Sequence, residues 1–308
     1  TNLIAPAMPI VMQRGLVFPS LFGLAVNEKF NYPNYFQIMP AGPSPLTDWS
    51  KGFFDVAMAQ NPRPKTIALV GADAEFARNA VKGARENAKK LGMKIVYDQT
   101  YPPRTADYSP IIRAIQARKP DIVFVGSYPP DSVGMVKAAT EIGLKTRMFG
   151  GGMVGLQFAS IMTALGPKLN GIVNYDFWVP EPTLKFEGVE AFLAKYQEAA
   201  KGQGVDPLGF YLQPYAYAYL QVLEQAITAT KSMDHAKVGA HMRTSTYDTV
   251  VGKVSFAKNG EWAKTRVLMV QYQGVKDNKL ETFAKQGTRV VLYPPEWKSG
   301  DINFPYSK

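Results

Sequence analysis

Residues 66–71 read TIALVG, an apolar run that ends in glycine, and residues 121–126 read DIVFVG. Apolar runs of this length without polar alternation are typical of strands that are buried on both faces of a parallel sheet. An amphipathic helical pattern at residues 74–91 follows the first run and ends at Gly92, a residue type that commonly terminates helices. This strand–helix–strand order predicts a parallel sheet sandwiched by helices.

The alternation of strand-like and helix-like segments continues on both sides of these runs. Between them lie a strand-like segment at 94–97 and a helix-like one at 108–118, and a helix at 131–142 and a short strand at 147–150 follow. We therefore expect one complete α/β lobe. Outside it the pattern changes, and we expect three helices at about 186–201, 211–231 and 235–244, and strands at 252–256, 265–272 and around 290–293. The first 60 residues predict a helix at 3–14, a strand at 16–19 and a helix at about 45–59, too little to close a sheet.

Composition limits the class of protein. The 308 residues are 46% hydrophobic and 19% charged, which is ordinary for a globular chain and leaves room for two domains. The chain has no cysteine, which excludes disulfides, thiolate metal sites and a cysteine nucleophile. No apolar run approaches the roughly 20 residues of a membrane-spanning helix.

The formal net charge is +10, and much of the basic excess lies between residues 78 and 119. Arg78, Lys82, Arg85 and Lys89 are spaced so that they share one face of a helix. The pattern favours a solvated helix face, with a docking face for an anionic partner as the alternative. A nucleic-acid partner is not expected, because no aromatic residues interleave with the basic ones.

The segment 150–155 reads GGGMVG and matches the glycine pattern of dinucleotide-binding proteins, with Asp176 at the distance where such proteins carry an acid. The match lies at the fourth strand of its sheet, however, and does not open the first strand–helix–strand unit. We therefore expect a glycine-rich loop at the carboxyl end of a strand, and a nucleotide-dependent enzyme is the minor alternative. The two histidines, His235 and His241, share no helix face, so we predict no catalytic set, metal site or cofactor.

Three residues follow successive predicted strands at their carboxyl ends: Phe76, Tyr128 and Met153. Because the carboxyl ends of parallel strands meet at one edge of a sheet, we expect these side chains to converge on a ligand.

The order of these segments resembles that of a known family. The matching stretches are residues 5–7 (APA) to 14–15 (RG), 65–70 (KTIALV), 107–112 (DYSPII), 119–126 (KPDIVFVG) and 252–256 (GKVSF). From residue 1 to about 293 the chain resembles the periplasmic solute-binding proteins of ABC importers, of the leucine/isoleucine/valine-binding type. The resemblance implies two α/β lobes joined by three crossovers, which close on a small molecule and deliver it to a membrane permease without a chemical reaction. It also implies a secreted, periplasmic protein whose signal peptide is not present in this chain. A ligand-sensing receptor or regulator on the same fold is the alternative.

The resemblance also indicates where a ligand would bind. In the first lobe the family's contacts correspond to residues 1–2 and 21–23, and in the second lobe to Phe76 and Tyr128. Amino-acid binders hold the ligand's ammonium group with an acid after the fourth strand, and here Gly152 and Met153 stand there. The sequence therefore predicts an aromatic or apolar acid as ligand. The expected ligand-binding residues are Phe22, Gly23, Phe76, Tyr128, Gly152, Met153, Trp178 and Tyr211.

The resemblance further implies a domain division. Family members carry a β-α-β-α-β block before the helix that here begins at Leu3. We therefore expect residues 1–42 and 179–250 to form a truncated first lobe, residues 43–178 and 251–293 a complete lobe, and residues 294–308 a C-terminal tail. A homodimer that covers the truncated lobe is predicted, and the alternatives are that the block was removed or that it lies on another chain.

Overall fold

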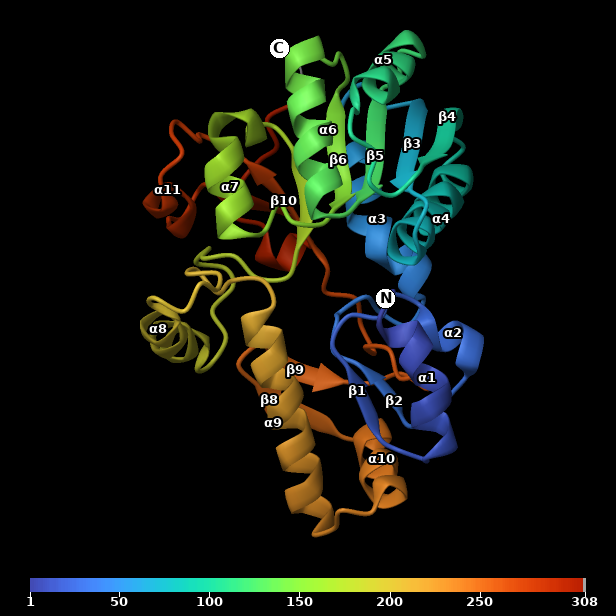
Figure 1. Cartoon of the computed structure of the whole chain (residues 1–308), viewed down its shortest axis with the longest axis vertical. Coiled ribbons are helices and arrows are strands. Elements are labelled where there is room, and N and C mark those ends of the chain that lie inside the picture. Colours follow the sequence, from blue (N-terminus) through green and yellow to red (C-terminus); the bar gives the residue numbers. More distant parts are fainter. Residues whose placement is uncertain (307–308) are drawn as a thin grey trace. The chain divides into compact units, whose positions relative to one another are not determined.

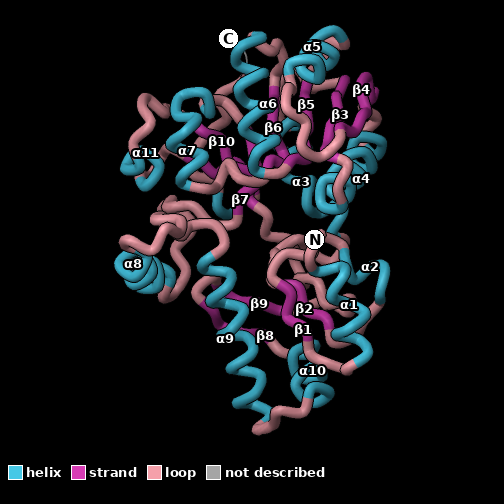
Figure 2. Tube along the Cα trace, in the orientation of Figure 1, coloured by secondary structure: helices cyan, strands magenta, loops and turns pink. Residues whose placement is uncertain are grey.

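The computed structural model describes residues 1–306, which divide into two compact units (Figures 1 and 2). Unit 1 comprises Thr1–Trp49 and Lys185–Arg266, and unit 2 comprises Ser50–Leu184 and the chain from Val267 onward. The expected interleaving of segments is present, but the boundaries differ. Residues 43–49 and 251–266 lie in unit 1 and residues 179–184 in unit 2, each opposite to the expectation.

Unit 2 is built around one sheet of seven strands. In spatial order these are β11 (Arg289–Tyr293), β10 (Leu268–Tyr272), β7 (Val173–Asp176), β6 (Met148–Met153), β5 (Ile122–Ser127), β3 (Thr66–Ala72) and β4 (Lys94–Tyr101). Strands β3 to β7 are parallel, and β10 and β11 are antiparallel to their neighbours. Every residue of β5 and β6 is buried, as the apolar runs predict.

Helices cover both faces of this sheet, which confirms the predicted fold class. They are α4 (Glu75–Lys90), α5 (Ser109–Ala117), α6 (Pro129–Ile142), α7 (Ala159–Leu165), α11 (Leu280–Ala284), the short 3-10 turns η1 (Gly166–Leu169) and η2 (Pro295–Trp297), and most of α3 (Pro45–Met58). Figure 1 shows α6 in front of the strands and α3 behind them. The predicted apolar face of α4 is buried at Ala77, Val81, Ala84 and Ala88. Leu91, the last residue of the predicted helical pattern, lies beyond the helix end and is 47% exposed.

Residues 150–153 of the glycine-rich segment lie in strand β6 and not in a loop, so the prediction is wrong for them, and only Val154 and Gly155 lie in the turn that follows the strand. Gly150 and Gly151 lie inside β6 with φ of 138° and 100°, a region that L side chains rarely adopt. A Cβ atom would lie 2.0 Å from the Val173 carbonyl oxygen at the first position and 2.3 Å from the Phe124 ring at the second. These glycines therefore let β6 fit between β5 and β7, and they form no phosphate-binding loop.

Asp176 is likewise structural. At the end of β7 its Oδ2 lies 3.0 Å from Nη1 of Arg289, at the start of β11, and both side chains are 1% exposed. Burial raises the pKa of Asp176 to about 6, although the guanidinium opposes this shift. An acid committed to a buried ion pair is not placed to bind a ribose, and the alternative of a nucleotide-dependent enzyme loses its second feature.

Unit 1 is richer in helix and has only two small sheets. Its elements are α1 (Ile4–Gln13), β1 (Phe18–Ser20), α2 (Val26–Phe30), β2 (Tyr35–Gln37), α8 (Val189–Ala200), α9 (Gln213–Thr230), α10 (His235–Thr244), β8 (Thr246–Thr249) and β9 (Gly252–Ser255). Strands β1 and β2 pair in parallel, and β8 and β9 pair antiparallel. The second pairing holds β9 in unit 1, whereas the sequence placed it in the complete lobe.

The end of the chain packs against unit 2. The amide of Ser299 donates to the Val291 carbonyl (2.9 Å), and that of Tyr306 donates to the Arg147 carbonyl (2.8 Å). The amide of Asn303 donates to Oε1 of Gln271 (2.7 Å). The predicted tail is thus an integral part of this unit through residue 306, and its last two residues lie outside the described ones.

Candidate functional site

The carboxyl edge of the sheet in unit 2 carries two of the predicted ligand-binding residues. Phe76 lies in the first turn of α4 after β3, and Tyr128 immediately precedes α6 after β5. Their ring centroids are 6.0 Å apart at 75°, an edge-to-face pair. Phe76 is 8% exposed and Tyr128 is half-buried. The sheet topology thus brings these two aromatic residues together as predicted.

A buried carboxylate fixes the position of Tyr128. Oδ2 of Asp131 accepts a hydrogen bond from the Tyr128 amide (3.2 Å) and another from the hydroxyl of Tyr101 (3.2 Å). Oδ1 accepts from the hydroxyl of Tyr108 (2.7 Å). Burial and the neighbouring carboxylate raise the pKa of both tyrosines, so both remain hydroxyl donors at neutral pH. This network joins the end of β4, the residue before α5 and the first turn of α6.

The network was not predicted. The segment 107–112 supported the family resemblance, but nothing local to Tyr101, Tyr108 or Asp131 indicates that they meet. A signal existed only in the predicted topology, since all three lie at the carboxyl edge of the sheet, at or after the end of β4 or β5, the two strands on either side of β3.

Gly152 and Met153 end β6 and are enclosed. The Met153 side chain has no exposed surface. Its amide donates to Oδ1 of Asn174 (2.9 Å) and its carbonyl accepts from Nδ2 of the same side chain (2.8 Å). A Cβ on Gly152 would lie 3.1 Å from the Val125 carbonyl oxygen. In this structure these residues hold adjacent strands together and do not join Phe76 and Tyr128 at an exposed surface.

Trp178 ties down the chain that follows β7. It is 5% exposed, and its Nε1 donates to the carbonyl of Leu184 (3.0 Å). Both residues belong to unit 2, and the bond closes the segment between them into a loop. The indole thus has a structural role in this unit.

Unit 1 contains a second aromatic pair from the predicted set. The rings of Phe22 and Tyr211 are stacked, with centroids 5.7 Å apart and planes 14° apart. Phe22 is half-buried and Tyr211 is 7% exposed. Gly23 serves packing, because a Cβ there would lie 2.6 Å from the hydroxyl of Tyr35. Each unit therefore presents one aromatic pair from the residues singled out in the sequence.

Unit 1 also buries an acid that sequence analysis missed. Glu261 is 1% exposed, and neither of its carboxyl oxygens has a hydrogen-bond partner among the described residues. Burial, and then the charge of Glu28, raise the pKa of Glu261 well above its usual value. An acid two residues after Asn259 in a turn gives no sequence signal of burial.

The histidines and acids form no metal site. Nδ1 of His235 accepts from the Val17 amide (3.1 Å), and His241 packs edge-on against Tyr247 with ring centroids 6.1 Å apart. Within residues 1–306, no three His, Cys, Asp or Glu side chains are placed to hold a metal ion. In the same span, no helix is long and apolar enough to cross a membrane.

Comparison with known proteins identifies the family of this chain. A family model described as "Periplasmic binding protein" matches residues 1–279, most of both units. The chain belongs to the periplasmic binding protein family. The resemblance found in the sequence is thereby confirmed, and curated proteins described as Leu/Ile/Val-binding are among the relatives that the chain is similar to.

Two relatives show how far the sequence has diverged from curated members of the family. The Leu/Ile/Val/Thr-binding protein of Salmonella typhimurium is 24% identical over 204 residues, 65% of this chain and 51% of that protein. The Leu/Ile/Val-binding protein homolog 8 of Brucella melitensis is 26% identical over 251 residues, 76% of this chain and 58% of that protein. The chain thus spans between half and three-fifths of the length of these relatives.

Solved structures of periplasmic binding proteins share the fold. A leucine-binding protein from Thermotoga maritima matches with a TM-score of 0.70 at 16% identity, covering 88% of this chain and 74% of the other. A solute-binding protein of an ABC transporter from R. palustris, solved in complex with benzoate, matches with a TM-score of 0.73 at 17% identity, covering 94% and 74%.

Proposed function

We propose that this protein binds a small organic acid in the periplasm and delivers it to the permease of an ABC importer, without catalysing a reaction. Family membership supports solute binding. The observation that carries the ligand class is the pair of aromatic residues in each unit, Phe22 with Tyr211 and Phe76 with Tyr128. Aromatic rings supply large contact areas for flat or apolar ligands.

The charges at the carboxyl edge favour an acid without an ammonium group. Strand β6 ends in Gly152 and Met153, so no carboxylate projects from that strand end. Asp131 is nearby but already accepts three hydrogen bonds. A buried ammonium without a counter-charge is costly, which disfavours a zwitterionic amino acid.

A ligand carboxylate has a candidate donor group in unit 2. Helix α4 begins at this edge, and Ala74 before it has no side chain that could cap the amides of the first turn. Helix N-termini favour anions. Helix α6 begins with Pro129 and Pro130, which have no N–H groups to offer. Of these two helix starts, α4 is therefore the one that can offer amides to a carboxylate, and Glu75 in its first turn opposes this attraction.

A thermal-shift screen tests the ligand class. Benzoate and related aromatic acids, short aliphatic acids, and leucine, isoleucine and valine are compared at equal concentrations. The proposal predicts the largest rise in melting temperature with aromatic or apolar acids, because bound ligand stabilises the folded state. A larger rise with the branched-chain amino acids would contradict it. The R. palustris relative, whose structure contains benzoate, is the positive control.

Tyr128→Ala is expected to weaken binding of the best acid by about 1–3 kcal/mol, roughly tenfold to more than a hundredfold in Kd, because an aromatic contact is lost. Isothermal titration calorimetry measures the change. Tyr128→Phe is the matched control, since it keeps the ring and should retain most of the affinity. If the alanine variant binds as tightly as the wild type, Tyr128 does not contact the ligand.

We further propose that a second copy of this chain covers part of unit 1. Seven large hydrophobic side chains are exposed in the described structure, and six lie in this unit. They are Leu3, Ile10, Val205, Tyr217, Leu220 and Met233. Exposed apolar patches in soluble proteins commonly mark an interaction surface.

Sedimentation velocity at micromolar concentration is expected to show a dimer. Leu220→Glu should shift it to monomer, because burying that charge in the interface is unfavourable. Leu91→Glu is the matched control, since this side chain is 47% exposed in unit 2 and should leave the dimer intact. A stable wild-type monomer that binds no apolar-surface dye would refute the dimer.

A further inference from the structure

The positive charge of this protein is concentrated in unit 2. That unit contains 23 Lys and Arg against 15 Asp and Glu, and so carries eight of the ten net charges of the chain. Unit 1 is nearly balanced, with 12 basic and 10 acidic residues. The basic character is therefore a property of one unit and not of the whole surface.

The sheet topology gathers part of this charge at one edge. Strands β3, β4 and β5 are parallel, so the segments that precede them lie together at the amino edge of the sheet. Each of these three segments is basic. The exposed cations there are Arg63 and Lys65 before β3, Lys89 and Lys90 at the end of α4 with Lys94 at the start of β4, and Arg118 and Lys119 before β5. We call these seven residues the amino-edge cations.

The amino-edge cations are not neutralised. None of them forms an ion pair within the described chain. Asp121, just before β5, accepts from the amides of Lys65 (2.7 Å) and Thr66 (2.9 Å) through Oδ2, and its Oδ1 lies 3.9 Å from Nη1 of Arg147, so it pairs with none of the seven. The two arginines of the basic stripe of α4 differ, because Arg78 pairs with Asp73 (2.8 Å) and Arg85 with Asp98 (2.6 Å).

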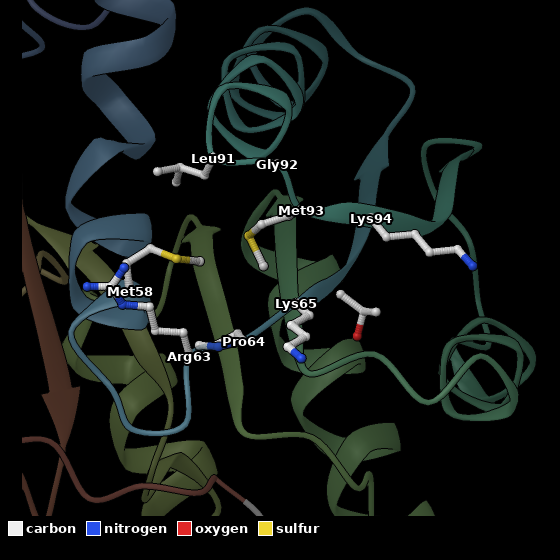
Figure 3. Close-up of a pocket in the computed structure, with 9 residues that line it drawn as sticks. Met58, Arg63, Pro64, Lys65, Leu91, Gly92, Met93 and Lys94 are labelled. Atoms are coloured by element: carbon white, nitrogen blue, oxygen red, sulfur yellow. The ribbon is translucent and has the colours of Figure 1, made fainter.

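An apolar depression lies among these cations. It encloses about 590 Å³ and is lined by Arg63, Lys65 and Lys94 together with Met58, Leu91 and Met93. Figure 3 shows Leu91, Met93 and Met58 around the depression, while the ammonium group of Lys94 extends away from it. Leu91 is 47% exposed. Among the described residues of unit 2, no other large hydrophobic side chain is exposed.

We propose that the amino edge of unit 2 docks on a membrane surface rich in anionic phospholipid. Lysine and arginine side chains spread over three segments suit a diffuse layer of negative headgroups, to which each cation adds a similar attraction. The exposed Leu91, with half-buried Met58 beside it and buried Met93 beneath, gives the surface an apolar centre whose leucine can enter the headgroup boundary. This docking is separate from ligand capture, because the carboxyl edge at the other end of the strands carries Phe76 and Tyr128.

An acidic protein surface or a free anion fits these observations less well. The cations come from flexible side chains on separate segments and include no buried donor, so the structure shows no shaped anion site. The apolar centre would be left in water by inorganic phosphate. A bilayer engages both the charges and the apolar side chains.

Co-sedimentation with lipid vesicles tests the proposal. The wild type is expected to bind vesicles containing phosphatidylglycerol at low ionic strength, to leave them as salt rises, and to ignore vesicles of phosphatidylcholine alone. The triple variant Arg63→Glu, Lys65→Glu, Lys94→Glu should lower the partition coefficient on the order of a hundredfold. Leu91→Ala should lower it by a smaller factor at every salt concentration.

The matched control changes the same net charge elsewhere. Lys185, Lys195 and Lys237 are exposed in unit 1, and their replacement by Glu should leave most vesicle binding intact. Equal loss in both triple variants would show that net charge alone matters, and would overturn the docking surface. So would no wild-type binding to the anionic vesicles, or tighter binding to polyglutamate than to them. Binding of the organic acid, measured on the same variants, reports separately on the proposed function and on folding.

Discussion

Arg289→Met is expected to lower the free energy of unfolding by about 3–5 kcal/mol, because it leaves the Asp176 carboxylate buried without its counter-charge. The two side chains are 1% exposed and lie 3.0 Å apart, and burial already raises the pKa of Asp176 to about 6 with the guanidinium present. Methionine fills much of the arginine volume, so a cavity adds little. Urea denaturation followed by circular dichroism measures the loss.

The double variant Asp176→Asn, Arg289→Met separates charge from packing. It should recover much of the lost stability, since no unpaired charge remains in the core of unit 2. If the free energy of unfolding of Arg289→Met lies within about 1 kcal/mol of the wild-type value, water reaches this pair. The conclusion that the ion pair is buried would then be wrong.

Glu261→Gln is expected to change how stability depends on pH. Burial raises the folded-state pKa of Glu261 well above its usual value, whereas the unfolded value is about 4.3. As pH rises above that value, the unfolded carboxyl loses its proton while the folded one keeps it. The free energy of unfolding therefore falls, by about 1.4 kcal/mol per pH unit, until the folded pKa is reached. The glutamine variant lacks this fall.

Urea denaturation of both proteins at several pH values between about 4 and 7 measures the difference. Asp176 contributes a fall of the same sign below about pH 6, but equally in both proteins, so comparing them isolates Glu261. Parallel pH profiles for wild type and variant would show that Glu261 is solvated or paired.

The central strands were predictable because the residues of each strand alone indicate that it is buried. Residues 66–71 and 122–126 are apolar without alternation, and each lies within a strand of the structure. The short strands β2 and β8 were missed, because three or four residues show no period and their pairing depends on partners elsewhere in the chain. The glycine segment misled for a related reason. Its amino-acid pattern matches that of a phosphate-binding loop, but its conformation depends on close contacts with Phe124 and Val173, which are distant in the sequence.

The candidate site shows the same division. Phe76 and Tyr128 could be placed together from topology alone, because each follows a parallel strand. Asp131 could not be assigned, since its partners Tyr101 and Tyr108 come from other elements and hydrogen bonds leave no periodic pattern. Met153 obeyed the topological rule but turned inward, where its backbone is held by Asn174. Strand-end position predicts location but not side-chain direction.

The central claim is that this chain binds a small organic acid through its aromatic pairs. Isothermal titration calorimetry of the wild type with the best acid of the screen tests it most directly, with Phe76→Ala and Phe22→Ala as variants of unit 2 and unit 1. We expect the wild type to bind the acid and Phe76→Ala to weaken that binding by about 1–3 kcal/mol, while Phe22→Ala tests separately whether the aromatic pair of unit 1 contributes. No binding of any acid by the folded wild type, or unchanged affinity in both variants, would contradict it.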